Sequence, residues 1–426
     1  MKKPKRSHRL LYGQGSFYYD EANKVWIGVL EAGLDENGKR RRAKVSSANE
    51  DTAWKKLTEK IKAIQAGKTT LENSDATTLA QWCETWLEDR KAVARPTTYD
   101  NDKIAVNKHL LPLLGKKRLM DIDANDVRRL ARKIREQGGS STTIGYYQGR
   151  LQTILRDARR EGYIVSDTAI LAKRAEKAVN TRTALSADDA TKILLKAIET
   201  LPECSYWIVA FLQGLRQGER LGLTWDRIDF VTNTITIDRQ LQELTYADKE
   251  LGTFDYPDGY DYQQLEGTYH LVPTKNSRGR GKNFVIPMIP VVRSYLLAWK
   301  AVSPPSPHGL VWPLSDGRIR NKKYDGAQWR KLQDQADVHK GQGYYVGHEI
   351  RNTTATLLLT IGVDPEIIKA IMGHSTVAMS MAYTRVNSGH MERALQGMAE
   401  ALHLEAPPSE VVVVEQVGGS EVIELE

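Results

Sequence analysis

The sequence predicts a multidomain protein that is mainly α-helical and contains small β-sheets. The chain is 426 residues long, has long stretches with apolar residues at helical spacing, and has only a few short runs of strand character. A chain of this length ordinarily forms about two to four domains. Its hydrophobic fraction of 41% is sufficient to build their cores.

The first module, residues 1–68, predicts a basic arm, a three-stranded sheet and one helix. Runs of aromatic and β-branched residues separated by turns predict three strands, at Phe17–Tyr19, Val25–Val29 and Arg40–Val45. Apolar residues at helical spacing predict a helix from Glu50 to Ala66. We expect Trp26 to lie in the core, whereas Tyr18 fits either the core or the surface. Residues 69–74 then form a linker.

The second module, residues 75–177, predicts a small bundle of four helices. The first is marked by Leu79, Trp82 and Trp86, and the second runs from Ile104 to Leu111, before Pro112. The other two end at glycines; they are marked by Val127, Leu130 and Ile134, and by Ile144, Leu151 and Ala158.

The third module, residues 178–400, predicts a mixed α+β domain. A capping box at Ser186 and Asp189 opens a helix, and Tyr206 to Leu212 forms an apolar helix. Three strands of one small sheet are expected, at Thr234–Ile237, Tyr269–Val272 and Phe284–Ile286. In the acidic tail, residues 401–426, we expect one short strand at 411–414; the tail either docks on this subunit or a neighbouring one, or is disordered.

Positive charge is concentrated in the first two modules. Residues 1–68 carry 16 Lys+Arg against 8 Asp+Glu, and residues 75–177 carry 20 against 14. Residues 178–400 are close to neutral, with 25 against 24, and the tail has six Glu and no cation. Two basic modules ahead of a neutral one indicate a polyanionic partner.

Several classes of protein are disfavoured by the sequence. No apolar run approaches the roughly 20 residues that a membrane span needs. The basic N-terminus lacks the apolar core of a signal peptide. Cys83 and Cys204 are too few and too far apart for a disulfide framework. We therefore expect a cytoplasmic protein with no membrane partner.

The stretch from Gly347 to Val386 carries the strongest chemical signal. It contains His348 and Arg351 three residues apart, then His374 and Tyr383. A side chain that cleaves a phosphodiester must act as a nucleophile, with cations to hold the phosphate oxygens and an acid to protonate the leaving oxygen. The sequence HEIR is not HExxH, so no metal is expected.

Two upstream segments supply the remaining groups. The first, Gly214 to Glu219, reads GLRQGE and places Arg216 between small residues that let a phosphate approach. The second, from Pro273 to Lys282, is a glycine-rich cationic segment that we expect to form a hairpin tip. Lys275 at its strand end is better positioned as an acid than Lys282.

In this order the motifs GLRQGE, TK, HEIR, GHST and AYTRV resemble those of the tyrosine recombinases, the phage integrases. The likeness is close over residues 182–395 and looser over 75–177. Residues 1–68 are similar in pattern to the arm-binding domains of integrases. The resemblance implies a site-specific recombinase that integrates or excises a phage or mobile element through a 3′-phosphotyrosyl intermediate. It requires no cofactor.

The resemblance also implies a role for each residue of the site. Tyr383 would be the nucleophile, Arg216 and Arg351 would hold the phosphate, and Lys275 would protonate the 5′-oxygen. His348 would act as general base or phosphate donor, His374 would hydrogen-bond the phosphate, and Glu219 would support the site.

The partners expected are duplex DNA at core-type and arm-type sites, other copies of the chain in a tetrameric synapse, a DNA-bending host factor and an excisionase. The protein would act in the cytoplasm of a bacterial host. The side chains expected to grip DNA are all cationic: Lys2, Lys3, Arg40, Arg41, Arg42, Arg128, Arg129, Arg132, Arg156, Arg159 and Arg160.

The sequence departs from the family pattern at two places. Asn352 replaces a histidine that often follows the HxxR arginine, which should not remove catalysis. Residues 243–266 form a longer connection than expected, with seven acids and one lysine. We expect this acidic insertion to face away from DNA, and a footprint that places it on DNA would contradict this.

Three other functions are compatible with parts of this sequence. A chromosome-dimer resolvase would not need residues 1–68, and a type IB topoisomerase fits HEIR and GHST less well. A catalytically silent DNA-binding regulator of the same fold is disfavoured by the complete set of six catalytic side chains.

Overall fold

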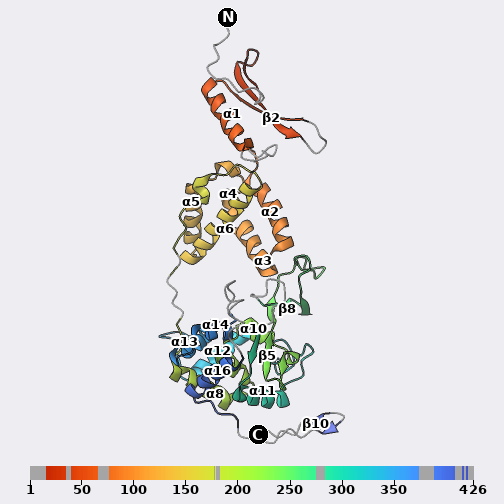
Figure 1. The fold of residues 1–426 in the computed structure, drawn as a ribbon, viewed down its shortest axis with the longest axis vertical. Coiled ribbons are helices and arrows are strands. Elements are labelled where there is room, and N and C mark those ends of the chain that lie inside the picture. Colours follow the sequence, from red (N-terminus) through yellow and green to blue (C-terminus); the bar gives the residue numbers. More distant parts are fainter. Residues whose placement is uncertain are drawn as a thin grey trace. The chain divides into compact units, whose positions relative to one another are not determined.

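The computed structural model describes residues 16–34, 40–65, 76–176, 178, 183–274, 284–373 and 388–407, and two pairs of residues in the tail, 415–416 and 419–420. Only the backbone is described for 31–34, 40–43 and 60–65. The chain divides into two compact units, Met1–Val179 and Asn180–Glu426. Figure 1 shows the helices and strands of each unit. The predicted fold class, mainly helical with small sheets in several domains, is confirmed.

The N-terminal sheet contains the three predicted strands, which pair antiparallel in the order β1-β2-β3. Its strands are β1 (Ser16–Asp20), β2 (Val25–Leu34) and β3 (Arg40–Ser47), and helix α1 (Glu50–Gln65) follows. Helix α1 packs so closely on the sheet that a Cβ on Gly28 would lie 2.6 Å from Leu57 Cδ1.

Aromatic packing builds the core of this small module. Trp26 is buried as predicted, and it stacks on Phe17 with ring centroids 5.4 Å apart. Tyr18 lies one residue along from Phe17 and is 41% exposed, because successive side chains of a strand point to opposite faces. The structure therefore places Tyr18 on the surface. The arm with Lys2 and Lys3 lies outside the described residues.

The helices of the second module enclose a core of its own, formed by residues such as Leu79, Trp82, Leu130 and Leu151. These helices are α2 (Leu79–Val93), α3 (Pro96–Ile104), α4 (Leu111–Leu114), α5 (Ala124–Glu136), α6 (Ser141–Arg160) and the short α7 (Asp167–Ile170). Helices α5 and α6 are followed by Gly138 and Gly162 at positive φ, as the sequence predicts.

The second predicted helix differs from the expectation. It begins earlier, at Pro96, and continues past Pro112 to Leu114 through a π-helical turn, η1 (Ala105–Leu110). This wider turn places Pro112 in the first turn of α4, where the missing proline N–H is tolerated.

The C-terminal unit opens with α8 (Ala187–Thr200), α9 (Ser205–Leu212) and the short α10 (Gln217–Leu221). The Ser186 hydroxyl accepts the Asp189 N–H at 3.1 Å, which is one half of the predicted capping box. All eight residues of α9 are buried, so this helix forms the centre of the core.

The six described strands between α10 and α11 form two sheets, and the prediction of one small sheet was wrong. The first has the order β4-β5-β9 and the second β6-β8-β7. Their bounds are β4 (Ile228–Asp229), β5 (Thr234–Ile237), β6 (Arg239–Glu243), β7 (Gln263–Glu266), β8 (Tyr269–Pro273) and β9 (Phe284–Pro287). The insertion supplies β7 and the end of β6. Both pair with β8, so β8 does not join β5 and β9.

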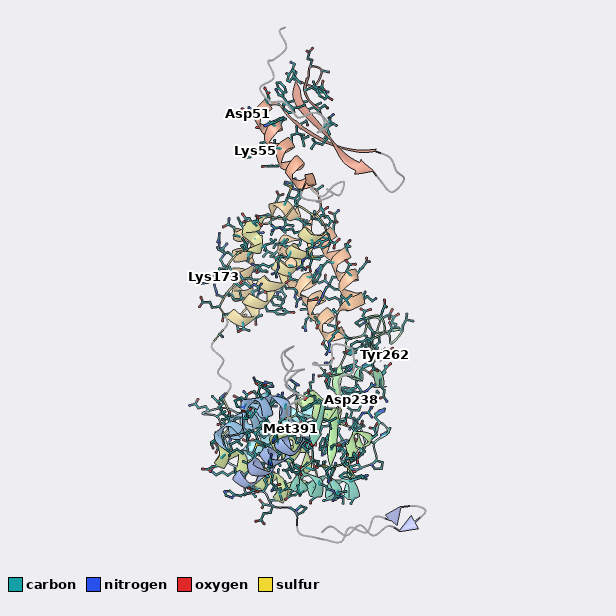
Figure 2. All side chains as sticks on the ribbon, in the orientation of Figure 1. Asp51, Lys55, Lys173, Asp238, Tyr262 and Met391 are labelled. Atoms are coloured by element: carbon teal, nitrogen blue, oxygen red, sulfur yellow. The ribbon has the colours of Figure 1, made fainter. Side chains whose placement is uncertain are left out.

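The acidic insertion is a folded element held by aromatic contacts. Tyr256 stacks on Tyr262 with ring centroids 3.7 Å apart, and Phe254 meets the buried His270 of β8 edge to face at 4.5 Å. Tyr256 Oη lies 2.8 Å from His270 Nε2. Figure 2 labels Tyr262 within this insertion.

Helices complete the unit and lead toward the tail. They are α11 (Pro290–Val302), α12 (Lys322–Gln335), α13 (Gly347–Thr360), α14 (Pro365–Ile371) and α16 (Ser388–Ala401). In the tail, β10 (Glu415–Gln416) pairs with β11 (Gly419–Ser420), and residues 411–414 lie outside the described residues. No helix in the described part of the chain is long and apolar enough to cross a membrane.

Candidate active site

The turn between α9 and α10 presents Arg216. It depends on Gly214, which has a φ of +58° and whose added Cβ would lie 2.8 Å from Met372 Sδ. Only glycine adopts this conformation at no steric cost, and here it also lets the turn approach the end of α14. Arg216 then stands at the N-cap position of α10.

Glu219 orients Arg216 from within the same short helix. Its Oε1 accepts a hydrogen bond from Arg216 Nη1 at 2.7 Å, and its Oε2 accepts one from the Arg216 backbone N–H at 2.8 Å. Glu219 is buried, whereas the Arg216 side chain is 26% exposed. The arginine is therefore held on one side and accessible on the other, as a phosphate-binding group must be.

Arg351 on α13 is buried and connects three segments. Its Nη1 donates to the carbonyl of Gly214 at 2.5 Å, and its Nη2 donates to the carbonyl of Met372. The turn that carries Arg216 and the end of α14 are thus fixed to the same guanidinium. A guanidinium has five N–H donors, so it can serve these carbonyls and still offer donors to a phosphate.

His348 lies in the first turn of α13 and is exposed. The sequence places His348 and Arg351 on one helix face, and the structure distinguishes them by burial, since Arg351 is only 5% exposed. The exposed imidazole and the buried guanidinium thus suit different roles.

Glu349, between them, secures the start of α13. Its carboxylate accepts hydrogen bonds from the backbone N–H groups of Thr183 at 2.8 Å and Val346 at 2.7 Å, and from Lys340 Nζ. Burial acts to raise the pKa of Glu349, but these hydrogen bonds outweigh it and hold the pKa below its usual value. Sequence reasoning missed this residue, although its place three residues after Val346 is that of a capping glutamate.

Lys275 lies outside the described residues, but the strand that leads to it is placed. Strand β8 ends at Pro273, and the Thr274 N–H donates to the Asp238 carbonyl at 3.0 Å. Strand β6, which pairs with β8, lies directly against α10. A Cβ added to Gly222, at the end of α10, would be only 2.5 Å from the backbone nitrogen of Leu241 on β6. The chain therefore reaches residue 274 on the sheet that packs against the helix of Arg216.

The expectation that residues 273–282 join two paired strands was wrong. In the described part of the chain, β8 pairs with β6 and β7, and β9 pairs with β5. The segment with Lys275 therefore connects two different sheets. The physical reason is again the insertion, whose strands occupy both edges of β8.

His374 and Tyr383 lie outside the described residues, as do all residues from 374 to 387. The residues on either side of this segment are placed. Gly373 ends α14 with a φ of +56°, next to the Met372 carbonyl that Arg351 binds, and α16 begins at Ser388. His374 thus follows directly from a backbone position next to Arg351.

The predicted DNA-binding arginines of the second module lie on α5 and α6. Arg128, Arg129 and Arg132 are exposed on α5, opposite its buried Val127 and Leu130. On α6, Arg156 and Arg160 are exposed. Several of these arginines also have partners within the module: Arg129 pairs with Asp126 at 3.3 Å and Arg160 with Asp157 at 3.0 Å, and the less exposed Arg159 binds Asp167 at 2.6 Å and the Val165 carbonyl at 2.9 Å. The side chains of Arg40, Arg41 and Arg42 are not described.

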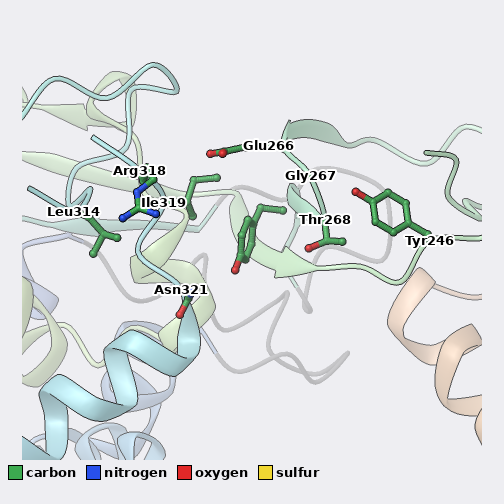
Figure 3. Close-up of a pocket in the computed structure, with 9 residues that line it drawn as sticks. Tyr246, Glu266, Gly267, Thr268, Leu314, Arg318, Ile319 and Asn321 are labelled. Atoms are coloured by element: carbon green, nitrogen blue, oxygen red, sulfur yellow. The ribbon is translucent and has the colours of Figure 1, made fainter. Parts of the chain in front are cut away.

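A pocket of about 410 Å³ lies elsewhere on the C-terminal unit (Figure 3). Its lining comes from Tyr246, the β7–β8 turn and the segment before α12, including Arg318 and Asn321. None of the predicted catalytic residues that the structure describes, Arg216, His348 and Arg351, contributes to its lining, so this pocket is distinct from the described site around Arg216 and Arg351.

Two parts of the chain match models of known families. Residues 78–134 match the phage integrase N-terminal SAM-like domain, and residues 260–390 match the phage integrase family. The second match contains HEIR, GHST and AYTRV, whereas Arg216 precedes it.

Relatives match over most of their length. A tyrosine recombinase XerC-like protein of Caldanaerobacter subterraneus is 26% identical over 87% of this chain and 94% of its own. An integrase of Saccharopolyspora erythraea is 22% identical over 85% and 90%. A fragment of the Tn1549 transposon integrase, solved with circular intermediate DNA, has the same fold, with a TM-score of 0.56 and 16% identity over 75% of this chain and 99% of that one.

Proposed function

The chain belongs to the phage integrase family of tyrosine recombinases, and we propose that it cleaves and rejoins duplex DNA with Tyr383 as nucleophile. As a site-specific recombinase, it would integrate or excise a mobile element. The single observation that carries the proposal is the position of Arg351. This buried residue holds the Arg216 turn and the start of the GHST segment together, so side chains more than 130 residues apart can meet one phosphate.

The proposed chemistry conserves bond energy. The Tyr383 oxygen attacks the phosphorus, the bond to the 5′-oxygen breaks, and a 3′-phosphotyrosyl link forms. Lys275 donates its proton to the departing 5′-oxygen, and His348 accepts the proton of Tyr383 or donates to the phosphate. Arg216, Arg351 and His374 stabilise the charge on the phosphate oxygens. The reverse attack by a 5′-hydroxyl rejoins the strand, so no ATP is needed.

We assign the substrate contacts by module. Residues 75–177 and 178–400 would both contact the core site, with the exposed arginines of α5 and α6 on phosphates. Residues 1–68 would bind separate arm sites. In support, Tyr18 and the exposed Lys44 lie on the sheet face opposite α1, a face that can enter a major groove.

Recombination joins two DNA sites, and each site has two cleavage positions. We therefore propose that four copies assemble on DNA, with a bending host factor and an excisionase as further partners. The reaction would take place in the cytoplasm of a bacterial host.

The test uses the full chain and a core-type half-site with a nick beside the scissile phosphate, which traps the covalent complex. Wild type is expected to form an adduct that survives denaturation, and Tyr383→Phe should bind the same DNA with no adduct. If wild type binds this DNA but forms no adduct under any condition, the chain is a DNA-binding regulator and the proposed reaction is wrong.

A further inference from the structure

A buried polar cluster lies directly beneath the turn that presents Arg216. Gln217 Nε2 donates a hydrogen bond to Asp325 Oδ2 at 2.7 Å. The other oxygen of Asp325 accepts hydrogen bonds from Arg320, at 3.2 Å from Nε and 3.1 Å from Nη2. Asp325 and Arg320 are each 2% exposed. The residue after Arg216 is thus connected to a buried ion pair at the start of α12.

The same cluster also holds the residue before Arg216. Arg220 is 1% exposed and donates through Nη1 to the Leu215 carbonyl at 3.0 Å. Its guanidinium carbon lies 4.8 Å from the centre of the Tyr206 ring, and that of Arg320 lies 4.1 Å from the same ring. Two buried guanidinium groups therefore share one aromatic ring, and Asp325 is the buried carboxylate that binds Arg320.

Such a cluster is a poor way to gain stability. Desolvating the charges costs as much as their attraction returns, so well-packed apolar residues would serve as well or better. What the hydrogen bonds from Gln217 to Asp325 and from Arg220 to the Leu215 carbonyl provide is a defined backbone geometry. Here that geometry is imposed on Leu215 and Gln217, the two immediate neighbours of Arg216.

We propose that Asp325 is a positioning residue for strand cleavage. By holding Gln217, it fixes the orientation in which the Arg216 side chain extends from its turn. The proposal rests on the proposed function, in which Arg216 holds the scissile phosphate. Glu219 holds the Arg216 side chain from its own helix, and Asp325 fixes the backbone from which that side chain starts. Because an arginine misplaced by a fraction of an ångström loses much of its effect on the transition state, the cluster acts on the rate of cleavage.

The experiment measures single-turnover cleavage of the nicked half-site by saturating full-length protein, together with the dissociation constant for the same DNA. Asp325→Asn places a donor opposite the Gln217 amide, and Gln217→Glu places a second carboxylate opposite Asp325. Each single variant is expected to slow cleavage by about tenfold or more, which corresponds to about 1.4 kcal/mol in the barrier, while the dissociation constant stays within about twofold.

The double variant Asp325→Asn with Gln217→Glu distinguishes positioning from general damage. It reverses the direction of the hydrogen bond between residues 217 and 325 and keeps one carboxylate in that pair. The cleavage rate is expected to return to within about threefold of wild type. Asp334→Asn, at the far end of the same helix α12, is the matched control because its carboxylate is exposed, and it should cleave as wild type does.

Two results would overturn the proposal. If all three cluster variants cleave at the wild-type rate, Asp325 does not position Arg216. If the double variant is as slow as the single ones and melts at a lower temperature, the cluster only supports the fold. Arg216→Ala in the same assay keeps the two ideas apart. If Arg216→Ala cleaves as wild type does, both the proposed role of Arg216 and the positioning role of Asp325 fail. If Arg216→Ala does not cleave but the cluster variants cleave at the wild-type rate, the proposed function stands and only the positioning role fails.

Discussion

The Arg351 guanidinium donates hydrogen bonds to the carbonyls of Gly214 and Met372. In the proposed reaction the same guanidinium also holds the scissile phosphate. An unpaired buried carbonyl is costly, so Arg351 supports the architecture of the site in addition to its proposed role in the chemistry.

Replacing Arg351 by alanine is expected to lower the free energy of unfolding of the C-terminal unit by about 2–4 kcal/mol, because two buried carbonyl groups lose their partners. The measurement is the denaturant midpoint of that unit in the full chain. Arg216→Lys is the comparison, since it keeps a cation beside Glu219; it should abolish or strongly slow cleavage with less than about 1 kcal/mol of destabilisation. Equal stability of Arg351→Ala and wild type would contradict the structural role.

At the scale of elements, the acidic insertion shows the clearest limit of sequence reasoning. Its charge and unusual length are visible in the sequence, and the three strands around it were placed correctly. Their pairing was not, because strand pairing depends on which edges meet in space and not on the pattern within each strand. The contacts of Phe254, Tyr256 and Tyr262 around His270 then explain how a strongly acidic segment folds.

The insertion should loosen as the pH falls. Burial lowers the pKa of His270, so its ring stays neutral in the folded insertion while the unfolded chain takes up a proton below a pH of about 6.5. Stability is thus complete above that pH and is lost as the pH drops toward the folded value. Amide exchange of residues 244–262, corrected for the intrinsic rate, should be faster at pH 5.5 than at pH 7.5.

His270→Gln provides the control for this prediction, because glutamine cannot titrate. Its exchange is expected to be the same at both pH values, even if it is faster overall than in wild type. Wild-type protection that does not change between pH 7.5 and 5.5 would rule out His270 as the cause.

At the scale of the whole molecule, the first module has its own small core around Phe17, Trp26 and Leu57, separate from the cores of the helical bundle and the C-terminal unit. A module that folds around its own core can bind DNA without altering the chemistry elsewhere. This is the physical basis for proposing two independent kinds of DNA site.

Replacing Arg40, Arg41 and Arg42 by alanine in the full chain is expected to weaken arm-site binding while cleavage of the core half-site continues at the wild-type rate. Each lost phosphate contact should reduce the slope of log affinity against log salt by about 0.9. Footprinting and salt titration measure both effects. Lys55→Ala with Lys56→Ala, on the exposed side of α1 (Figure 2), is the matched control and should leave the arm footprint intact. If the triple variant keeps both its footprint and its salt slope, the arm assignment is wrong.

The sequence by itself determined the fold class, the presence of helices such as α1, α2, α5, α6, α8 and α9, and the candidate set of residues for the chemistry. These are local properties, since apolar periodicity, capping residues and motif spacing are written along the chain. The tertiary structure decided which strands pair, that Arg351 unites Gly214 with Met372, and that Asp325 and Arg220 hold the neighbours of Arg216. Those contacts join residues far apart in the chain or buried together in the core, and only packing in three dimensions sets them.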